Sequence, residues 1–595
     1  MGGELNSIVK DRENVEVRFA FCFPDTYEVG MSHLGMKILY SELNTQSWLW
    51  CERVFAPWFD MEEELRKAQV PLYALESGDS VGEFDIVGFT LQYELSYTNV
   101  LNMLDLAGIP LLAKDRHSLK NLVVAGGPCV CNCEPLADFV DLFFLGEGEE
   151  VDLEVCALYR ACKSQGLSKE QFLEQAARIQ GVYVPTFYEV SYREDGTLAA
   201  ITPTHGAPAR VKKRVMMDLD KSYYPDRFVV PYIEIVHDRA VQEVFRGCIR
   251  GCRFCQAGFL YRPVREKSPE VVDRQCRALC ENTGYDEVSL SSLSTSDYSQ
   301  LNLLLDKLLL WSKEEKTSLS LPSLRVDGFQ REVLDKIKTV RRSGLTFAPE
   351  AGTQRLRNVI NKNVTEAQLR ETVLKAFQGG WSTIKLYFMI GLPTETLEDV
   401  CGIAELGQMV VDTYYACKDK PRGKGLKVTV SASAFIPKPF TPFQWEPQDT
   451  MEQMREKQMA LVHAVKTRKI TANWHDASTS FIEAVFARGD RRLGRALLEA
   501  HRRGCKMDGW ADGFSLERWL SVFRDCGIDP AFYANRRRPF DEILPWDHMD
   551  YGIDKNFLID ECRRAYQAQT TPNCHEACSA CGAAQFGGGI CYAQR

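Results

Sequence analysis

Cys248-Ile249-Arg250-Gly251-Cys252-Arg253-Phe254-Cys255 is the stretch that decides how this chain is interpreted. Its three cysteines, spaced C-x3-C-x2-C, can ligate three irons of a [4Fe-4S] cube and leave the fourth iron without a protein ligand. Clusters held by four thiolates typically carry electrons, whereas an open iron can bind a small molecule and pass an electron to it. The alternative is a zinc site, but zinc needs a fourth Cys or His close by, and downstream none comes before Cys276.

Length and composition predict a large globular protein. The 595 residues predict about two to four domains, and 45% hydrophobic residues are enough for a sizeable core. No apolar run approaches the ~20 residues of a membrane span, and the N-terminus lacks a basic and then apolar signal. We therefore expect a cytoplasmic protein with no membrane contact. Twenty-one cysteines in a chain this long predict reduced thiols and metal clusters rather than a disulfide framework.

The charge is acidic overall but uneven along the chain. A net charge of −9 and a pI of about 5.7 argue against general binding of polyanions. Residues 486–538 nevertheless contain twelve Lys or Arg against seven Asp or Glu. Solvated helix faces are the favoured interpretation of this basic segment, and a patch for RNA or another acidic substrate is the alternative.

Residues 1–180 alternate apolar strands with helical stretches. Strands are predicted at residues 17–23, 85–90, 121–127 and 140–146, with helices at 31–44 and 97–107 among them. This alternation predicts a doubly wound α/β domain with a parallel sheet. Ligands of such domains bind at the carboxyl ends of the strands.

The rest of the chain divides into three further parts. Residues 181–243 are predicted as a connector, with a hairpin at Glu194-Asp195-Gly196 and a strand at 233–237 that leads into the Cys loop. Residues 244–466 are predicted as a partial (β/α)6 barrel, with strands at 288–291, 318–322, 345–350, 383–388 and 428–431. Residues 467–595 are predicted to be helical up to a terminal Cys motif.

That terminal motif repeats the C-x3-C-x2-C spacing in Cys574, Cys578 and Cys581, and Cys591 offers a fourth ligand. Four thiolates suit an auxiliary [4Fe-4S] cluster or structural zinc; iron–sulfur is favoured, and free thiols are the alternative. Gly587-Gly588-Gly589 and the small residues around it leave little apolar surface to offset the entropy of ordering. We therefore expect a metal site to order this segment, close to the barrel mouth.

The order of these parts resembles an uncharacterised family of cobalamin-binding-domain radical SAM proteins. In the N-terminal part the resemblance rests on residues 24–35, 84–88, 126–128 and 146–149, and in the core on the Cys loop and residues 347–353, 386–396 and 435–445. It implies a [4Fe-4S] cluster on Cys248, Cys252 and Cys255 whose open iron chelates S-adenosylmethionine (SAM). It also implies reductive cleavage of SAM to a 5′-deoxyadenosyl radical, with a reductant such as flavodoxin or ferredoxin.

The resemblance extends to residues around the cluster. Phe254 is expected to pack on the cluster and shield it from solvent. Glu350 and the Gly391-Leu392 turn are expected to orient SAM, and Gly352 to let the backbone approach a ligand.

Two departures from the family pattern leave roles open. The Asp-x-His-x-x-Gly motif that ligates cobalt from below is absent around His33. Either cobalamin binds without a histidine on its lower face, or the N-terminal domain binds no cobalamin and is a scaffold. Ser294 and Asp297 stand where many members have a glycine pair and an acid for the methionine moiety, so no role is assigned there.

These observations predict a radical SAM enzyme that transfers a methyl or methylthio group to RNA or protein. One alternative is a radical rearrangement or carbon–carbon bond reaction on a small metabolite. Another is a non-catalytic iron–sulfur binding or sensor protein that keeps the fold.

Overall fold

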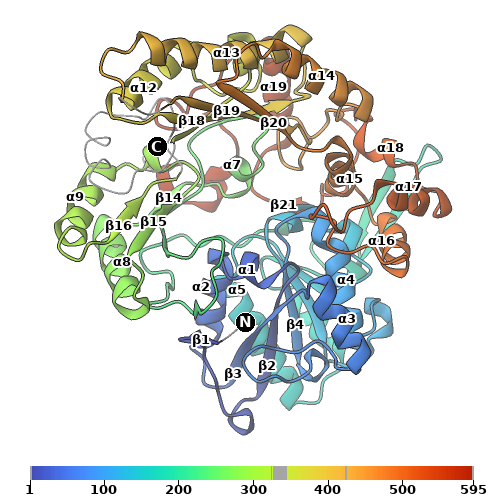
Figure 1. The fold of residues 1–595 in the computed structure, drawn as a ribbon. Helices are drawn as coiled ribbons and strands as arrows, with labels where there is room; N and C mark the ends of the chain where they lie inside the picture. Colours follow the sequence, from blue (N-terminus) through green and yellow to red (C-terminus); the bar gives the residue numbers. More distant parts are fainter. Residues whose placement is uncertain (1–2, 323–324, 326–344, 422–424, 592–595) are drawn as a thin grey trace.

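The computed structural model describes residues 3–322, 325, 345–421 and 425–591. An N-terminal α/β unit and an α/β core stack on each other, and the C-terminal helices flank both (Figure 1). The predicted mixed α/β architecture with a helical C-terminal region is confirmed.

The N-terminal unit is built on a six-stranded sheet. Its spatial order is β3 (Leu49–Phe55), β2 (Val17–Phe23), β4 (Ile86–Thr90), β5 (Leu122–Gly126), β6 (Leu142–Phe144) and β7 (Val182–Tyr183). All neighbours are parallel except β7, which runs antiparallel to β6. The chain order reverses between β2 and β4, which makes this edge a switch point where ligands bind in doubly wound sheets.

Helices cover both faces of this sheet. On one face, α2 (Leu34–Leu43) packs against α5 (Gly148–Ser164). On the other face, Arg66 of α3 (Phe59–Ala68) donates to Asn102 and Asp105 of α4 (Tyr97–Leu106). The helices predicted at 31–44 and 97–107 are therefore present, while β3 was not predicted and β7 carries the sheet past the expected boundary at residue 180.

The connector contains the predicted hairpin but not the predicted strand. Strands β8 (Tyr188–Tyr192) and β9 (Leu198–Pro203) pair antiparallel around Glu194-Asp195-Gly196. The strand predicted at 233–237 is wrong, because the strand that enters the core is β12 (Ala240–Glu243). Val236 is 62% exposed, whereas residues 240–243 alternate between buried and half-buried positions, as the face of a sheet requires.

The core consists of two parallel sheets whose strand order follows the chain. The first contains β12, β15 (Glu287–Ser291) and β16 (Ser318–Ser320), and the second contains β17 (Leu345–Glu350), β18 (Thr383–Ile390), β19 (Lys427–Ala434) and β20 (Ile470–Trp474). The helices between them are α8 (Pro269–Thr283), α9 (Leu301–Ser312), α11 (Gln354–Val359), α12 (Glu366–Gln378), α13 (Leu397–Ala416) and α14 (Met451–Ala464). This is the strand–helix alternation of a β/α barrel, and β20 extends it past the predicted end at residue 466.

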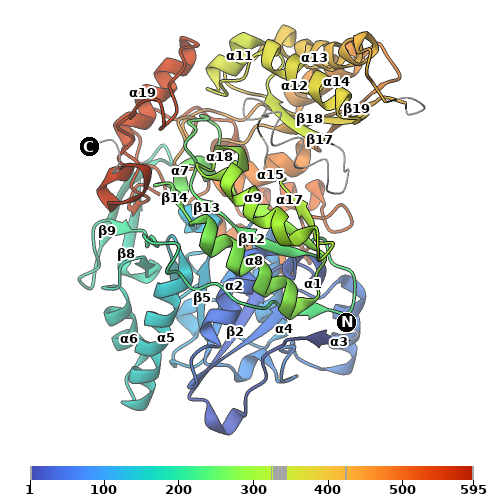
Figure 2. The ribbon, with the colours of Figure 1, turned by 90° about the vertical axis from the view of Figure 1, so that its left-hand side faces the viewer.

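The C-terminal region is helical and contacts both other parts. Its helices are α15 (Ala477–Ala487), α16 (Leu493–Arg502), α17 (Leu516–Asp525), α18 (Pro530–Ala534) and α19 (Lys555–Tyr566). Helix α16 packs on α4, and Asn132 of the N-terminal unit donates to the carbonyls of Ala487 and Gly489. Figure 2 shows α19 and the end of the chain beside β14 (Arg265–Glu266) and α7 (Ala257–Leu260). Among the described helices, none combines the length and apolarity that a bilayer crossing requires.

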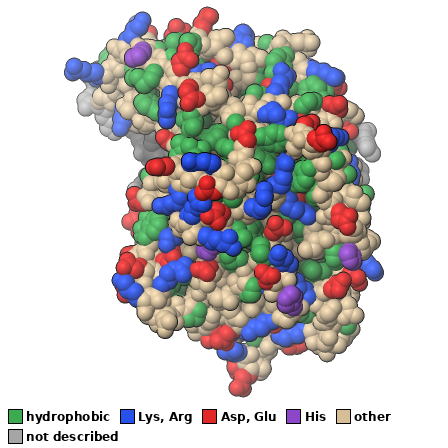
Figure 3. Space-filling view, turned by 90° about the vertical axis from the view of Figure 1, so that its right-hand side faces the viewer, with side chains coloured by type: hydrophobic (Ala, Val, Ile, Leu, Met, Phe, Trp, Pro, Cys, Tyr) green, Lys and Arg blue, Asp and Glu red, His purple; other side chains and the backbone are tan. Residues whose placement is uncertain are grey.

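The basic segment at 486–538 is mostly paired inside the protein. Arg488 and Arg538 are buried, Arg491 contacts Glu134 at 3.0 Å, and Arg492 contacts Asp490 at 2.6 Å. Arg503, Arg536 and Arg537 also face carboxylates. The face of the molecule in Figure 3 carries blue and red side chains intermingled rather than one basic field. These arginines tie the C-terminal helices to their neighbours, so they do not support a patch for RNA.

Candidate active site

The Cys loop is closed by two short strands. β13 (Phe245–Arg246), directly after β12, pairs antiparallel with β14, so residues 247–264 form a loop at the carboxyl end of a core strand. Gly247 has a φ of +89°, and a Cβ there would lie 2.8 Å from the Tyr261 carbonyl oxygen and 2.9 Å from that of Pro263. Only glycine fits this conformation and this close approach, which brings the two ends of the loop together.

The three thiols of the loop lie within electrostatic reach of one another. The Cys255 amide donates to the Cys252 carbonyl at 3.1 Å, and the Arg250 amide lies 3.4 Å from the Cys248 sulfur. Burial raises the pKa of Cys248 to about 11 and that of Cys255 to about 12, and the Cys252 thiol adds to both shifts. Metal ligation requires thiolates, so bound irons would supply the positive charge that this buried group lacks.

Arg253 fixes the loop to the rest of the core. Its fully buried guanidinium donates to Glu561 at 3.0 Å and to the carbonyls of Val359 at 2.8 Å and Gln569 at 2.8 Å. Its backbone amide donates to the Ile360 carbonyl at 3.0 Å. The loop is thus held by α19 and by the residues that follow α11, which are more than 100 positions away in sequence.

Two of the predicted cofactor residues lie in one apolar cluster. Phe254 is partly buried against the group that contains Leu356, Ile360, Leu392 and Phe435. The cluster therefore brings the Cys loop and the Gly391-Leu392 turn together, although the two are separated by more than 130 residues.

Glu350 lies close to the same thiols and forms an ion pair with Lys362. It ends β17 with a φ of +67°, and its Oε1 lies 3.1 Å from the Lys362 Nζ. Burial lowers the pKa of Lys362, and the charges of Glu350 and Cys252 overcome this effect and raise it. Lys362 also acts on Cys255. The Glu350–Lys362 pair is thus part of the site, and no motif in the sequence pointed to Lys362.

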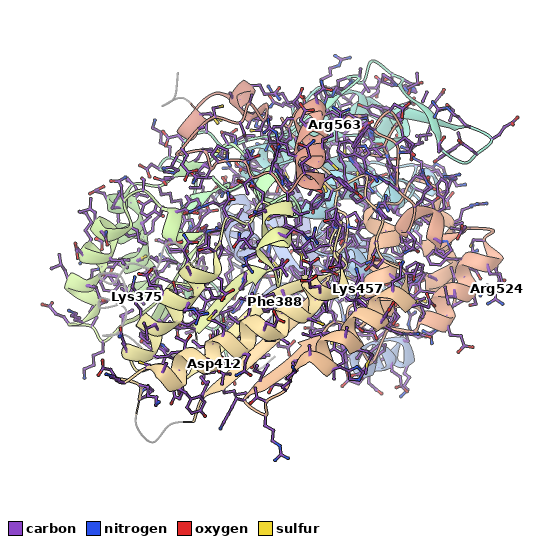
Figure 4. The ribbon with its side chains drawn as sticks, turned by 90° about the horizontal axis from the view of Figure 1, so that it is seen from above. Lys375, Phe388, Asp412, Lys457, Arg524 and Arg563 are labelled. Carbon is purple, nitrogen blue, oxygen red and sulfur yellow. The ribbon has the colours of Figure 1, made fainter. Side chains whose placement is uncertain are left out.

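The turn at Gly391 is fixed by a carboxylate. The Gly391 amide donates to Glu395 at 2.7 Å, and Lys457 of α14 lies 3.0 Å from the same carboxylate and 2.7 Å from Asp449. Burial raises the pKa of Glu395 to about 7, although Lys457 opposes the shift. Figure 4 labels Lys457 on α14 and Phe388 on β18, the strand that leads into this turn.

The expectation for Gly352 is wrong. A Cβ at Gly352 would overlap the Asp399 carbonyl oxygen, the Ile403 amide nitrogen and, at 2.6 Å, the Gly402 carbonyl carbon, all in α13. The missing side chain therefore allows the backbone of a helix, rather than a ligand, to approach. Asp297 also has a structural role, since it accepts a hydrogen bond from the Arg250 guanidinium in the Cys loop at 2.8 Å.

A cavity of about 410 Å³ lies between the N-terminal sheet and the start of the core. Phe21 and Gly88 line it from the sheet, Leu34 from α2, and Phe245 from the core. Gly126 also lines it, at the carboxyl end of β5. The cavity therefore occupies the predicted ligand-binding edge of the doubly wound sheet.

Polar groups in the cavity wall fall into two kinds. The buried oxygens Asp152 Oδ1 and Glu243 Oε2 have no hydrogen-bond partner within the described residues. His33 is engaged, because its Nδ1 accepts from the Met36 amide at 3.1 Å and its ring also bonds Gln92. Burial lowers the pKa of His33 to about 4, so the ring is neutral near pH 7.

The four terminal cysteines lie beside the Cys loop. The Cys574 amide donates to the Ile249 carbonyl at 3.0 Å, and Cys581, Cys578 and Cys591 follow in the same short segment. Within the described ranges, no three His, Cys, Asp or Glu side chains, in the Cys loop or in the tail, are arranged to hold a single metal ion.

Two family models match the chain. Residues 35–185 match the radical SAM protein N-terminal model, and residues 243–407 match the radical SAM superfamily model. Together they span more than half of the sequence and include the Cys loop. The chain belongs to the radical SAM superfamily and is a radical SAM enzyme.

Three curated proteins illustrate its relationships. An uncharacterized protein of Methanocaldococcus jannaschii is 27% identical over 512 residues, which cover 86% of this chain and 97% of that protein. A putative methylthiotransferase of the same organism is 27% identical over 164 residues, 26% of this chain and 36% of that protein. The anaerobic magnesium-protoporphyrin IX monomethyl ester cyclase of Cereibacter sphaeroides is 23% identical over 325 residues, 53% of this chain and 46% of the cyclase.

Two solved structures show a similar arrangement at low identity. The radical SAM methyltransferase TsrM from Kitasatospora setae, with cobalamin and a [4Fe-4S] cluster bound, is 14% identical with a TM-score of 0.46, over 70% of this chain and 74% of that one. The cobalamin-dependent SAM radical enzyme OxsB, with aqua-cobalamin bound, is 11% identical with a TM-score of 0.47, over 93% and 79%.

Proposed function

We propose that Cys248, Cys252 and Cys255 hold a [4Fe-4S] cluster that binds and reductively cleaves SAM. The observation that carries the proposal is the convergence of the three thiols in a loop at the carboxyl end of a core strand, inside the segment that matches the superfamily. Three thiolates leave one iron open, and the bound cluster would supply an electron for cleavage of the SAM sulfonium. A small electron carrier such as flavodoxin or ferredoxin would reduce it.

The residues around the thiols have separate tasks in this proposal. Phe254, on the apolar cluster with Leu392, excludes water from one side of the thiols. Glu350 accepts hydrogen bonds from a ribose or an amine of SAM, and Lys362 holds the carboxylate in place. The Gly391-Leu392 turn is held by Glu395 and so presents a fixed backbone edge to SAM.

The cavity at the edge of the N-terminal sheet fits one end of a corrinoid. Its volume of about 410 Å³ is within the range of ligand sites, and its unpartnered carboxyl oxygens on Asp152 and Glu243 suit amide N–H donors such as those on the rim of cobalamin. His33 is occupied by Met36 and Gln92, so cobalamin would bind here without a histidine ligand. A bound cobalamin would supply a methyl carrier next to the SAM site.

Methyl or methylthio transfer to RNA or protein is the reaction we favour for this site. The cavity opens between the N-terminal unit and the core, where a carrier could serve the SAM site, and a putative methylthiotransferase is among the relatives. The paired arginines at 486–538 remove one reason to prefer RNA over protein. The cyclase among the relatives favours, as a second candidate, carbon–carbon bond chemistry on a small metabolite.

Mass spectrometry of a deletion strain separates these reactions. Group transfer predicts that one modified nucleoside, or one modified peptide of a cellular protein, is missing from the strain and returns on complementation. A strain with unchanged RNA and protein but an accumulated small metabolite would contradict group transfer and support the second candidate.

Replacing Gly126 with Leu should strongly reduce retention of cobalamin. The nearest atom to a Cβ at this position is 3.7 Å away, so the backbone tolerates a side chain, which then fills the cavity. Overfilling a packed site costs about 1–3 kcal/mol, or roughly a tenfold loss of affinity or more. The measurement is cobalamin absorbance after gel filtration.

The matched control is Gly425→Leu, because a Cβ at Gly425 meets no atom of the described residues within 4 Å. It should retain cobalamin like the wild type. Equal retention by the Gly126 variant, with an unchanged melting temperature, would place cobalamin elsewhere or exclude it.

A further inference from the structure

We propose that Cys574, Cys578, Cys581 and Cys591 hold a second [4Fe-4S] cluster beside the Cys loop, with the buried Arg262 guanidinium between the two groups of thiols. This site goes beyond the SAM chemistry proposed above and does not depend on it. A cluster with four thiolate ligands has no open iron, so its role is to carry electrons or to fix structure.

The tail that carries these cysteines is docked on the Cys loop at several points. The Cys574 amide donates to the Ile249 carbonyl at 3.0 Å, and the Asp554 amide donates to the Cys581 carbonyl at 2.9 Å. Near the other end, a Cβ at Gly589 would overlap the carbonyl of Val264, the residue before β14. Both ends of the motif therefore contact the loop that holds the first three thiols.

The four thiols lie within electrostatic reach of one another. Burial raises the pKa of Cys591, and the thiols of Cys581, Cys574 and Cys578 raise it further. Burial also raises the pKa of Cys574, with Arg262 opposing the shift and Cys581 and Cys578 adding to it. Docking thus brings together four ligands that are spread over eighteen residues of sequence.

The segment has little else to order it. Between α19 and residue 591 the structure describes only two short 3-10 turns, η10 (Ala583–Phe586) and η11 (Gly589–Cys591). Ala583 is the buried apolar residue of this described segment, and most of the others are exposed or half-buried. Burial of so little apolar surface does not offset the conformational entropy, whereas metal–thiolate bonds supply folding free energy directly.

Arg262 connects the two groups of thiols. It is buried, and it donates to the Gly258 carbonyl at 3.0 Å and to the Arg250 carbonyl at 2.8 Å in the Cys loop. Its Nη1 has no hydrogen-bond partner within the described residues, and the guanidinium lies next to the Cys581 thiol. Burial lowers the pKa of Arg262. The charges of Cys581 and Cys574, with a smaller contribution from Cys248, overcome this effect and raise the pKa. One buried cation therefore faces the negative charge of both groups.

The sequence spacing of the thiols favours a cluster over zinc. The tail repeats the C-x3-C-x2-C spacing of the Cys loop and adds Cys591 as a fourth thiolate, which is the ligand set of a [4Fe-4S] cluster without an open iron.

Metal analysis of four reconstituted proteins tests the proposal. The wild type should contain about eight irons, and Cys248/Cys252/Cys255→Ala should keep about four. Cys574/Cys578/Cys581/Cys591→Ala should also keep about four. The control Cys401/Cys526→Ala removes two half-buried thiols away from both groups and should keep about eight.

The variant Cys248/Cys252/Cys255→Ala (the loop variant) tests for the second cluster even if Cys574/Cys578/Cys581/Cys591→Ala (the tail variant) does not fold. About four irons and the absorbance of a [4Fe-4S] cluster in that variant support a second cluster. One zinc in place of those irons, or no metal, would overturn the proposal. Loss of SAM cleavage in the same variant bears only on the first cluster, so the two proposals fail separately.

The position of Arg262 has its own test. Arg262→Gln removes a cation next to both clusters, so the reduction midpoints of both should fall relative to the wild type, while Arg262→Lys should restore most of the change. Redox titration followed by electron paramagnetic resonance measures both midpoints. Unchanged midpoints in Arg262→Gln would overturn the placement of the cation between the clusters.

Discussion

Replacing Arg253 with Met is expected to lower the free energy of unfolding by about 3 kcal/mol, because it breaks a buried ion pair and leaves Glu561 with only the half-exposed Arg564 as counter-charge. Arg253 is fully buried and Glu561 is 2% exposed, and their side chains meet at 3.0 Å. The substitution also removes the bonds to the carbonyls of Val359 and Gln569. Chemical denaturation of the aerobically purified, metal-free protein measures the effect without interference from a cluster.

Arg563→Met is the matched control on the same helix, α19. Arg563 lies on the surface (Figure 4) and pairs with Asp560 at 3.2 Å, and both side chains are at least 60% exposed. An exposed pair of this kind contributes about 0–1 kcal/mol. If the two variants unfold at the same denaturant concentration, Arg253 does not hold the Cys loop in the way described.

Replacing Gly352 with Ala is expected to cost about 3 kcal/mol, at the upper end of overpacking effects. The added methyl group meets backbone atoms of α13, including the Gly402 carbonyl carbon at 2.6 Å. Backbone of a packed helix cannot move aside as a flexible side chain can, so the strand end that carries Glu350 must shift instead. Thermal unfolding measures the loss, and SAM affinity should fall with it.

Gly425→Ala is the control for that change, since its Cβ meets nothing within 4 Å in the part of the chain that the structure describes. It should leave the melting temperature within about 1 °C of the wild type, because surface substitutions are usually neutral. A Gly352 variant as stable as this control would show that α13 does not pack on the Glu350 turn as closely as the structure indicates.

Strand prediction succeeded where the strands are mainly apolar. β2, β4, β5 and β6 are runs of mostly buried aliphatic and aromatic residues, with Arg18 in β2 as their single charged residue, and the pattern of a parallel sheet predicts them. β3 was missed because Glu52 and Arg53 interrupt its apolar run. Both are buried in the strand, where Arg18 bonds Glu52 at 3.0 Å and Glu76 bonds Arg53 at 2.7 Å. Pairing with residues far along the chain is not visible in a local pattern.

The other misses also depend on distant contacts. β20 is largely exposed at the edge of its sheet, with only Ile470 buried, so its apolar signal is weak. The charge count at 486–538 could not show that Arg491 meets Glu134 or that Arg492 meets Asp490. In the fold, basic residues of segment 486–538 form ion pairs with carboxylates of the same chain.

In the site, spacing alone predicted Cys248, Cys252 and Cys255 as cluster ligands, because the ligands of a cluster loop are close in sequence. Lys362 and Arg253 could not be assigned in this way. Their partners are Glu350, which lies in another motif, and Glu561, which is more than 300 residues downstream. The roles of Phe254, Glu350, Gly391 and Leu392 toward SAM remain predictions, although the structure places Phe254 and Leu392 in one cluster.

The most direct test of the central claim is formation of 5′-deoxyadenosine by the anaerobically reconstituted protein with SAM and dithionite. The wild type should form it, and Cys248/Cys252/Cys255→Ala should stay at the level of a reaction without enzyme. The variant Cys401/Cys526→Ala should behave like the wild type. Product formation that persists in the loop variant, or its absence from a wild type that carries iron and sulfide, would contradict a SAM-cleaving cluster at these three thiols.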